Sequence, residues 1–125
     1  MGRGATVLTI LLVGVPFAGA LVYSLYEPLI VYKLTDSTRV RVEMFSAQIE
    51  LYRQEKRRYP STEEGLAKVV AEGYARELPE DAWHNKLHYR YPSNRKSVPF
   101  ELWSLGADGK PGGIGDNADI GNWRE

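Results

Sequence analysis

The sequence predicts an α+β protein in which a long N-terminal helix, spanning a membrane in its first part, packs on a small antiparallel sheet. Three observations predict this. The run from Ala5 to Tyr26 contains no charged residue. Apolar residues then recur at three- and four-residue steps between Leu34 and Arg58. In two short segments, 87–91 and 100–103, apolar and polar residues alternate, as expected of strands with one buried face.

Length and composition limit what else the chain holds. Its 125 residues leave room for one small domain beside a membrane helix, so we expect an anchor over residues 1–33 and a globular domain over residues 34–125. Cysteine is absent, and no disulfide staples that domain. Sixteen basic and sixteen acidic residues cancel, which argues against a nucleic-acid partner.

The uncharged run has the length of a membrane span. As a helix, Ala5–Tyr26 would measure about 33 Å at about 1.5 Å per residue, close to a hydrocarbon core of about 30 Å. Tyr23 and Tyr26 suit the interface at its end. Arg3 precedes the run and Glu27 follows it, which places the N-terminus in the cytoplasm and the domain outside.

A cleaved signal peptide is the competing interpretation of this segment. Ala18-Gly19-Ala20 has the small-residue pattern of a signal-peptidase site. The apolar character nevertheless continues through Val22 and returns in Leu29-Ile30-Val31, which favours a retained anchor.

The globular domain begins with an amphipathic helix over Leu34–Arg58. Its predicted buried stripe is Val42, Phe45, Ile49 and Tyr52, and Pro60 lies beyond its end.

A short second helix is predicted next. Ser61 and Glu64 have the spacing of a capping box. Leu66, Val69 and Val70 form its apolar stripe, and Gly73 suits its C-terminal turn.

The remaining residues predict a hairpin and an irregular tail. Residues 74–86 form a loop, and the strands over 87–91 and 100–103 pair as an antiparallel hairpin. The segment 106–117 is too rich in Gly, Asp and Asn for regular structure, and 118–123 predicts a short final strand.

The glycine-rich segment is the candidate site. Asp108, Asp116 and Asp119 lie within twelve residues, and folding the loop brings like charges together unless a cation neutralises them. Calcium fits, since it accepts six to eight oxygens in irregular geometry. The carbonyls of Leu105 and Ala107 are the expected backbone ligands. The residues alone leave open a second interpretation, in which the aspartates cap turns and face water.

Catalytic signatures are weak throughout the sequence. No zinc-protease, phosphate-loop or dinucleotide motif occurs, and the segment between His84 and His88 does not suit a metal-binding helix. We therefore expect a protein that is not an enzyme.

Several motifs occur in an order that resembles a known family. They are Tyr59-Pro60-Ser61-Thr62-Glu63-Glu64-Gly65-Leu66, Gly73-Tyr74, Leu78-Pro79, Asp81, Trp83 with Asn85, Ser104-Leu105-Gly106-Ala107-Asp108-Gly109, and Ala118-Asp119-Ile120 with Asn122-Trp123. Together they look like the major pseudopilin, protein G, of bacterial type II secretion.

The resemblance implies a fold, a site and a role. The fold is pilin-like, with a long N-terminal helix on a small sheet. The site is a calcium loop, and the matching positions support Asp108 and Asp119 most strongly and Asp116 next. The role is that of a structural subunit of a periplasmic pseudopilus that drives protein export across the outer membrane. Its expected partners are further copies or other pseudopilins, the inner membrane and secretion platform proteins.

Two departures from the family pattern are visible. Gly4 is followed by Ala5-Thr6-Val7-Leu8-Thr9, where family members have Phe-Thr-Leu-Ile-Glu, and the glutamate that helps to align subunits is missing. Ala82, His84 and Lys86 replace the usual Pro, Gly and Pro. The first departure supports an alternative function, an anchored binding module derived from a pseudopilin that does not polymerise.

Overall fold

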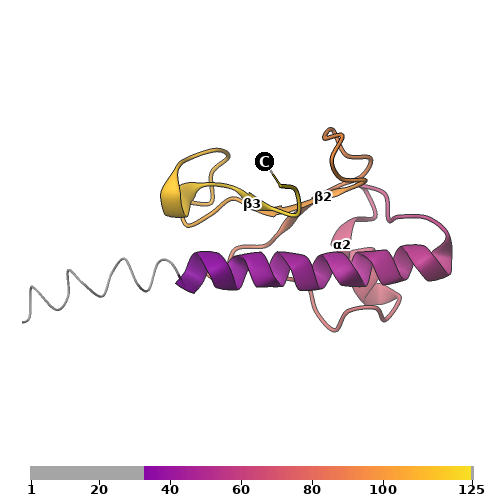
Figure 1. Ribbon diagram of the computed structural model, residues 1–125. Coiled ribbons are helices and arrows are strands. Elements are labelled where there is room, and N and C mark those ends of the chain that lie inside the picture. Colours follow the sequence, from indigo (N-terminus) through magenta and orange to yellow (C-terminus); the bar gives the residue numbers. More distant parts are fainter. Residues whose placement is uncertain (1–32, 125) are drawn as a thin grey trace, which may run out of the picture. The chain divides into compact units, whose positions relative to one another are not determined.

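A computed structural model describes residues 33–124 and divides the chain into two units after Lys33. The predicted membrane anchor therefore lies outside the described residues, apart from Lys33 itself. Over residues 33–124, none of the helices has both the length and the apolar character needed to cross a membrane. Figure 1 shows the second unit, with a sheet lying along one side of a long helix.

The predicted long helix is confirmed. Its described part covers residues 33–56. It ends where Arg57 adopts a left-handed conformation, φ 62°, and donates its N–H to the Arg53 carbonyl at 2.8 Å. This ending lies two residues before the predicted one, because Arg57 takes a role that glycine usually fills. All four residues of the expected stripe are buried, namely Val42, Phe45, Ile49 and Tyr52.

Helix α2 covers Gly65–Ala71. In the turn before it, the Ser61 N–H donates to Glu64 Oε2 at 2.8 Å and the Glu64 N–H donates to Ser61 Oγ at 3.1 Å. These reciprocal bonds confirm the capping box, although regular helix begins only after it. Gly73, two residues after the helix, has φ 85° and donates its N–H to the Val70 carbonyl at 3.0 Å, as expected of the C-terminal turn.

Three strands form one antiparallel sheet in the order β1-β2-β3. The strands are β1 (His88–Arg90), β2 (Glu101–Ser104) and β3 (Ile120–Gly121). Tyr89 lies opposite Leu102, which confirms the predicted hairpin. Strands β1 and β3 are shorter than predicted, whereas β2 has the predicted length but lies one residue further along the chain. One 3₁₀ turn, η1 (Gly115–Asn117), interrupts the irregular tail.

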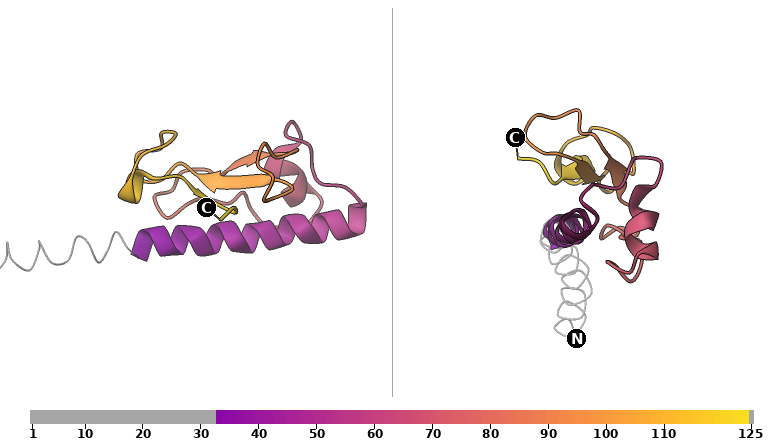
Figure 2. Two further views of the ribbon diagram at one scale, coloured as in Figure 1. Left: turned by 45° about the horizontal axis from the view of Figure 1, so that its top comes forward. Right: turned by 90° about the vertical axis from the view of Figure 1, so that its right-hand side faces the viewer.

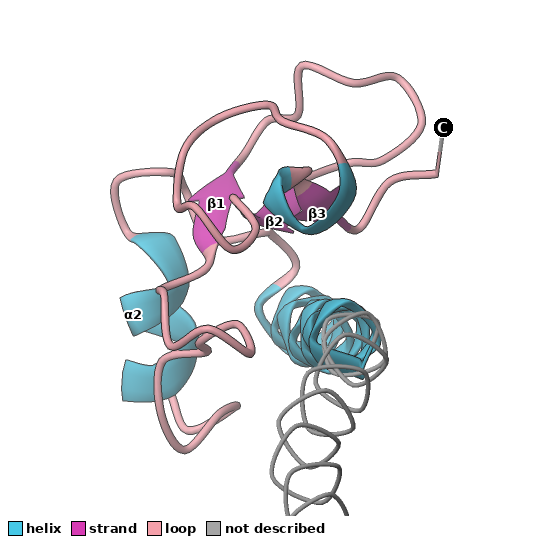
Figure 3. Cartoon of the chain, turned by 90° about the vertical axis from the view of Figure 1, so that its left-hand side faces the viewer, coloured by secondary structure: helices cyan, strands magenta, loops and turns pink. Residues whose placement is uncertain are grey.

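The long helix covers one face of the sheet, and α2 lies beside both (Figures 2 and 3). Each element contributes apolar side chains to one shared core. Its buried members are Val42, Phe45, Ile49, Leu66, Val69, Leu87, Phe100 and Leu102. Burial of these side chains holds the sheet against the helix.

The opposite face of the sheet carries aromatic and cationic side chains. His88 stacks on Trp103 with ring centroids 5.4 Å apart. The Arg95 guanidinium lies 3.8 Å from the centre of the Trp123 ring. Trp123 in turn covers Gly121, where a Cβ atom would collide with the indole. Trp103 and Trp123 therefore act as packing residues on this face.

Candidate functional site

The candidate site is the loop that joins β2 to β3, residues 105–119. Its two arms are packed together near the sheet. The Ala107 N–H donates to the Asp116 carbonyl at 2.8 Å. Gly106 has φ 77°, and a Cβ atom there would lie 2.7 Å from the Asp116 carbonyl oxygen and 2.8 Å from that of Ala118. Only glycine allows so close an approach of the two arms.

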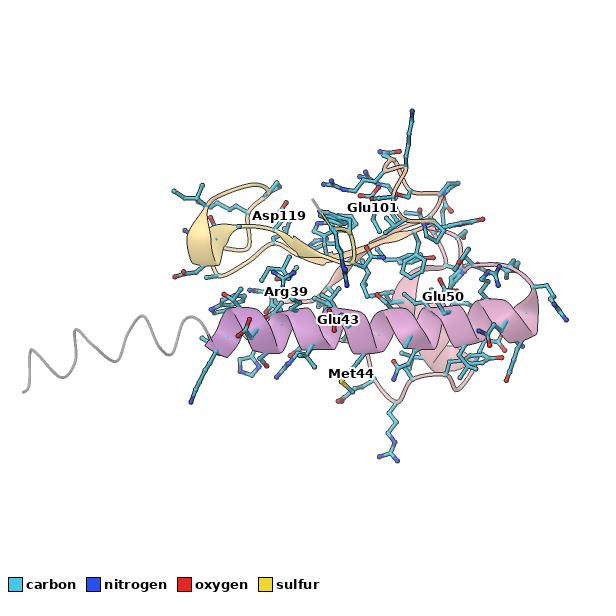
Figure 4. All side chains as sticks on the ribbon, viewed as in Figure 1. Arg39, Glu43, Met44, Glu50, Glu101 and Asp119 are labelled. Atoms are coloured by element: carbon cyan, nitrogen blue, oxygen red, sulfur yellow. The ribbon has the colours of Figure 1, made fainter. Side chains whose placement is uncertain are left out.

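Two of the three predicted aspartates bind backbone groups within the loop. Asp108 Oδ1 accepts the Lys110 N–H at 3.0 Å, which closes a local turn. Asp119 Oδ1 accepts the Gly112 N–H at 3.1 Å and so fixes the returning arm. Figure 4 shows Asp119 on the arm that leads into β3. These bonds are the ones expected of turn-capping aspartates.

The structure does not bring the three carboxylates together. Asp108 is exposed, whereas Asp116 and Asp119 are half-buried. Over residues 33–124, no three acidic or histidine side chains gather in a group able to hold a metal ion. The calcium site of the sequence analysis therefore stays a prediction.

The oxygen atoms of the loop nevertheless suit a hard cation. Within the described residues, the carbonyls of Leu105 and Ala107 accept no hydrogen bond, and neither does the Asp116 carboxylate. These oxygens lie on both arms of the loop, which the hydrogen bond between Ala107 and Asp116 holds together. Carboxylate and carbonyl oxygens are the ligands that calcium prefers. The loop offers suitable ligands, which an ion would have to draw together.

A buried polar cluster lies beside the start of this loop, at residues for which residue type and spacing alone predict no role. Asp81 is fully buried, and its Oδ1 accepts the N–H groups of Trp83 at 2.9 Å and Asn85 at 2.8 Å. Its Oδ2 accepts the Ser104 hydroxyl at 2.6 Å. A lone aspartate is normally solvated, so its residue type gives no sign that Asp81 is buried. The only signal in the sequence was that Asp81 and Ser104 both belong to the family-like motifs.

An open groove runs between the long helix and residues 73–80. It encloses about 800 Å³ and is lined on the helix by Arg41, Met44 and Gln48. Leu78 contributes an exposed apolar side chain from the other wall. In Figure 4, Met44 projects from the helix away from the sheet.

Charged pairs join the end of the long helix to α2. The Arg58 guanidinium donates to both Glu64 oxygens, at 2.7 and 2.8 Å. Lys56 Nζ lies 2.9 Å from Glu72 Oε2. The hydrogen bonds from Arg58 and from the Ser61 N–H lower the pKa of Glu64 to about 2. The contacts of the folded state at this junction therefore stabilise the charged form of Glu64.

Comparisons with known proteins agree on one family. The family described as Type II secretion system (T2SS), protein G matches residues 33–123. The chain is 38% identical over 95 residues to type II secretion system core protein G of Pseudomonas aeruginosa, covering 66% of this chain and 66% of that protein. It is 34% identical over 87 residues to the same protein of Vibrio cholerae, covering 60% and 58%. The matches thus span about two thirds or less of these relatives.

A solved structure supports the same likeness. The chain superposes on the crystal structure of the major pseudopilin from the type 2 secretion system of enterohaemorrhagic Escherichia coli with a TM-score of 0.63. The two share 27% sequence identity, and the superposition covers 74% of this chain and 88% of that one. The helix on a three-stranded antiparallel sheet is therefore a pseudopilin-like fold, as the sequence predicts.

Proposed function

Because the chain belongs to the type II secretion system protein G family, we propose that it is a structural subunit of a periplasmic pseudopilus that drives protein export across the outer membrane. Its role is to assemble and not to catalyse a reaction. The relatives are named as core proteins of this secretion system and as its major pseudopilin. The described domain supports the proposal through an exposed apolar surface on its long helix.

The observation that carries the proposal is an apolar stripe on the outer side of the long helix. Val40, Met44 and Leu51 are 52%, 63% and 47% exposed, although their neighbours on the opposite side are buried. Spacings of four and seven residues place these three on one face of the helix. A solvated helix gains nothing from such a stripe, whereas a helix packed against neighbouring copies buries it.

We place the chain in the inner membrane as a single-pass protein whose C-terminal domain lies in the periplasm. The uncharged run Ala5–Tyr26 supports this placement, together with the family. Its partners are then further copies of the chain or other pseudopilins, and proteins of the secretion platform. In a short filament of such subunits, the exposed apolar stripe of the long helix would form the contact between neighbouring copies.

We further propose that calcium stabilises the loop between β2 and β3. Asp108, Asp116 and Asp119, with the carbonyls of Leu105 and Ala107, would hold the ion. A bound calcium ion supplies positive charge that removes the repulsion between these carboxylates. At free calcium of about ten times Kd, binding would add about 1.4 kcal/mol to the free energy of unfolding. For a domain this small, that contribution is large.

Crosslinking in membranes tests the proposed assembly. The chain contains no cysteine, so two introduced thiols are the only ones. We choose Met44→Cys on the exposed stripe and Ile114→Cys on the loop, where the side chain is 88% exposed. With a bismaleimide linker, copies packed in a filament should give a ladder of covalent oligomers.

A control and a contrary result complete this test. In the control, Asn94→Cys on the exposed turn between β1 and β2 replaces Met44→Cys, and we expect a much weaker ladder. Monomer alone in every variant would contradict the filament and favour the anchored binding module. Equal ladders from both pairs would show assembly through a surface other than the helix stripe.

A further inference from the structure

The Asp81 carboxylate is bonded to a hydroxyl that also holds the start of the loop. Ser104 is fully buried at the end of β2 and donates its hydroxyl to Asp81 Oδ2. The same Ser104 oxygen accepts the Gly106 N–H at 3.0 Å. Ser104 is thus a bridge between a buried carboxylate and the residue at which the two arms of the loop meet.

The segment around Asp81 is bonded to the long helix as well. The Ala82 N–H donates to Thr38 Oγ1 at 3.0 Å, and Thr38 is fully buried. Arg41, one turn further along the helix, donates to the carbonyls of Glu80 at 3.2 Å and Asp81 at 3.1 Å. Helix and loop, far apart in the sequence, therefore share one set of hydrogen bonds.

The two bonds of the Ser104 hydroxyl are buried, and the bond from the Ala82 N–H to Thr38 is partly buried, which makes them costly to break. Each donor or acceptor that loses its partner in such a site keeps its full desolvation cost. A change at one of these groups is therefore expected to disturb the groups bonded to it.

We propose that Asp81 is a positioning residue that couples the order of the 105–119 loop to the packing of the long helix. Through Ser104 it fixes Gly106, and so places the carbonyls of Leu105 and Ala107. Through the backbone of residues 80–82 it fixes Thr38 and Arg41. The part of the inference that concerns calcium rests on the proposed function, whereas the coupling itself does not need the ion.

The decisive variant is Thr38→Val, which keeps the side-chain shape and removes the acceptor of the Ala82 N–H. Among residues 33–124, no hydrogen bond joins Thr38 to the loop of residues 105–119 directly. If the network couples the two, hydrogen exchange of the Ala107 amide in the full chain should speed up by about tenfold. Asp81→Asn and Ser104→Ala should do the same, and Ser104→Thr, which keeps the hydroxyl, should restore slow exchange.

A matched control separates coupling from general loss of stability. Tyr89→Phe removes the bond from the Tyr89 hydroxyl to the Pro60 carbonyl, 2.8 Å long, at the other end of the long helix. It should lower the melting temperature without changing exchange at Ala107. If Thr38→Val accelerates exchange at Ala82 alone, or if Tyr89→Phe matches its effect at Ala107, the coupling is overturned.

Calcium titration provides a second test of the proposal. Titration with calcium chloride should show Kd raised by about tenfold in Thr38→Val and unchanged in Tyr89→Phe. If the native chain binds no calcium, the proposed ion is refuted, and the exchange measurements still decide the coupling. If the native chain binds calcium and Thr38→Val leaves Kd unchanged, the link from helix to ion site is refuted while the ion stands.

Discussion

Asn122 and Leu102 exchange two hydrogen bonds, one through the backbone and one through the amide side chain of Asn122. The Asn122 N–H donates to the Leu102 carbonyl at 3.0 Å, and the Leu102 N–H donates to Asn122 Oδ1 at 3.0 Å. Asn122 Nδ2 then donates to the Phe100 carbonyl, also at 3.0 Å. The side chain of Asn122 therefore adds to the backbone hydrogen bonding between β2 and the residue that follows β3.

Asn122→Ala should destabilise the domain markedly. The substitution leaves the N–H of Leu102, a core residue, without its partner, and we expect the free energy of unfolding to fall by about 1–3 kcal/mol. Chemical denaturation of the purified chain measures this change. Asn94→Ala is the control, because the Asn94 side chain is exposed and makes no hydrogen bond among the described residues. Equal effects of the two variants would contradict the role of the amide.

His84→Gly should stabilise the domain. His84 has φ 65°, a left-handed conformation that costs a residue with a Cβ about 1 kcal/mol. Its ring is 86% exposed and lies 3.7 Å from Glu80, an exposed pair that contributes little. We expect a higher melting temperature in thermal unfolding. In contrast, His88→Gly in strand β1 should lower it. A lower melting temperature for His84→Gly would show that the imidazole makes a contact worth more than the strain.

Acid should weaken the junction between the long helix and α2. The pKa of Glu64 is lowered to about 2 from its ordinary value of 4.5, by hydrogen bonds from Arg58 and Ser61. A lowered pKa in the folded state means that the stabilisation is complete above about pH 4.5 and is lost as pH falls towards 2. Glu64→Gln keeps the shape and removes the charge. The difference in melting temperature between native chain and variant should therefore shrink from pH 6 to pH 3.

Glu63→Gln serves as control for the acid measurement. Glu63 is exposed and forms no ion pair within residues 33–124, so its substitution should leave the pH dependence unchanged. A native chain and a Glu64→Gln variant with parallel curves down to pH 3 would refute the contribution of the Glu64 charge.

Removal of calcium should lower the melting temperature of the outer domain. With free calcium near ten times Kd, chelation should cost about 5–10 °C, because about 1.4 kcal/mol is lost from a domain of this size. Asp119→Asn should remove the sensitivity to the chelator, and Asp36→Asn, an exposed aspartate on the long helix, should not. Identical melting curves with and without chelator in the native chain would refute a structural ion.

Periodic features of the sequence predicted most of the fold. The stripe from Val42 to Tyr52 repeats at helical spacing and is buried, and the capping box of Ser61 and Glu64 forms as its spacing indicates. Alternation predicted the hairpin. These features are local, so that a few neighbouring residues carry the whole signal.

Features that depend on tertiary contacts were not predictable in the same way. The predicted end of the long helix was wrong by two residues, because Arg57 adopts a left-handed conformation that is unusual for arginine. Asp81 is buried and accepts a hydrogen bond from Ser104, a residue 23 positions away. Whether Asp108, Asp116 and Asp119 share an ion depends on an energetic balance between charge repulsion and cation binding, which residue spacing does not determine.

Electron microscopy of the full-length chain tests the central claim most directly. The chain is overproduced in cells that lack their own protein G, with protein G of Pseudomonas aeruginosa as the positive control. We predict surface filaments that an antibody against residues 34–125 decorates. If the control forms filaments and this chain stays in the membrane as a monomer, assembly as the basis of its function is contradicted.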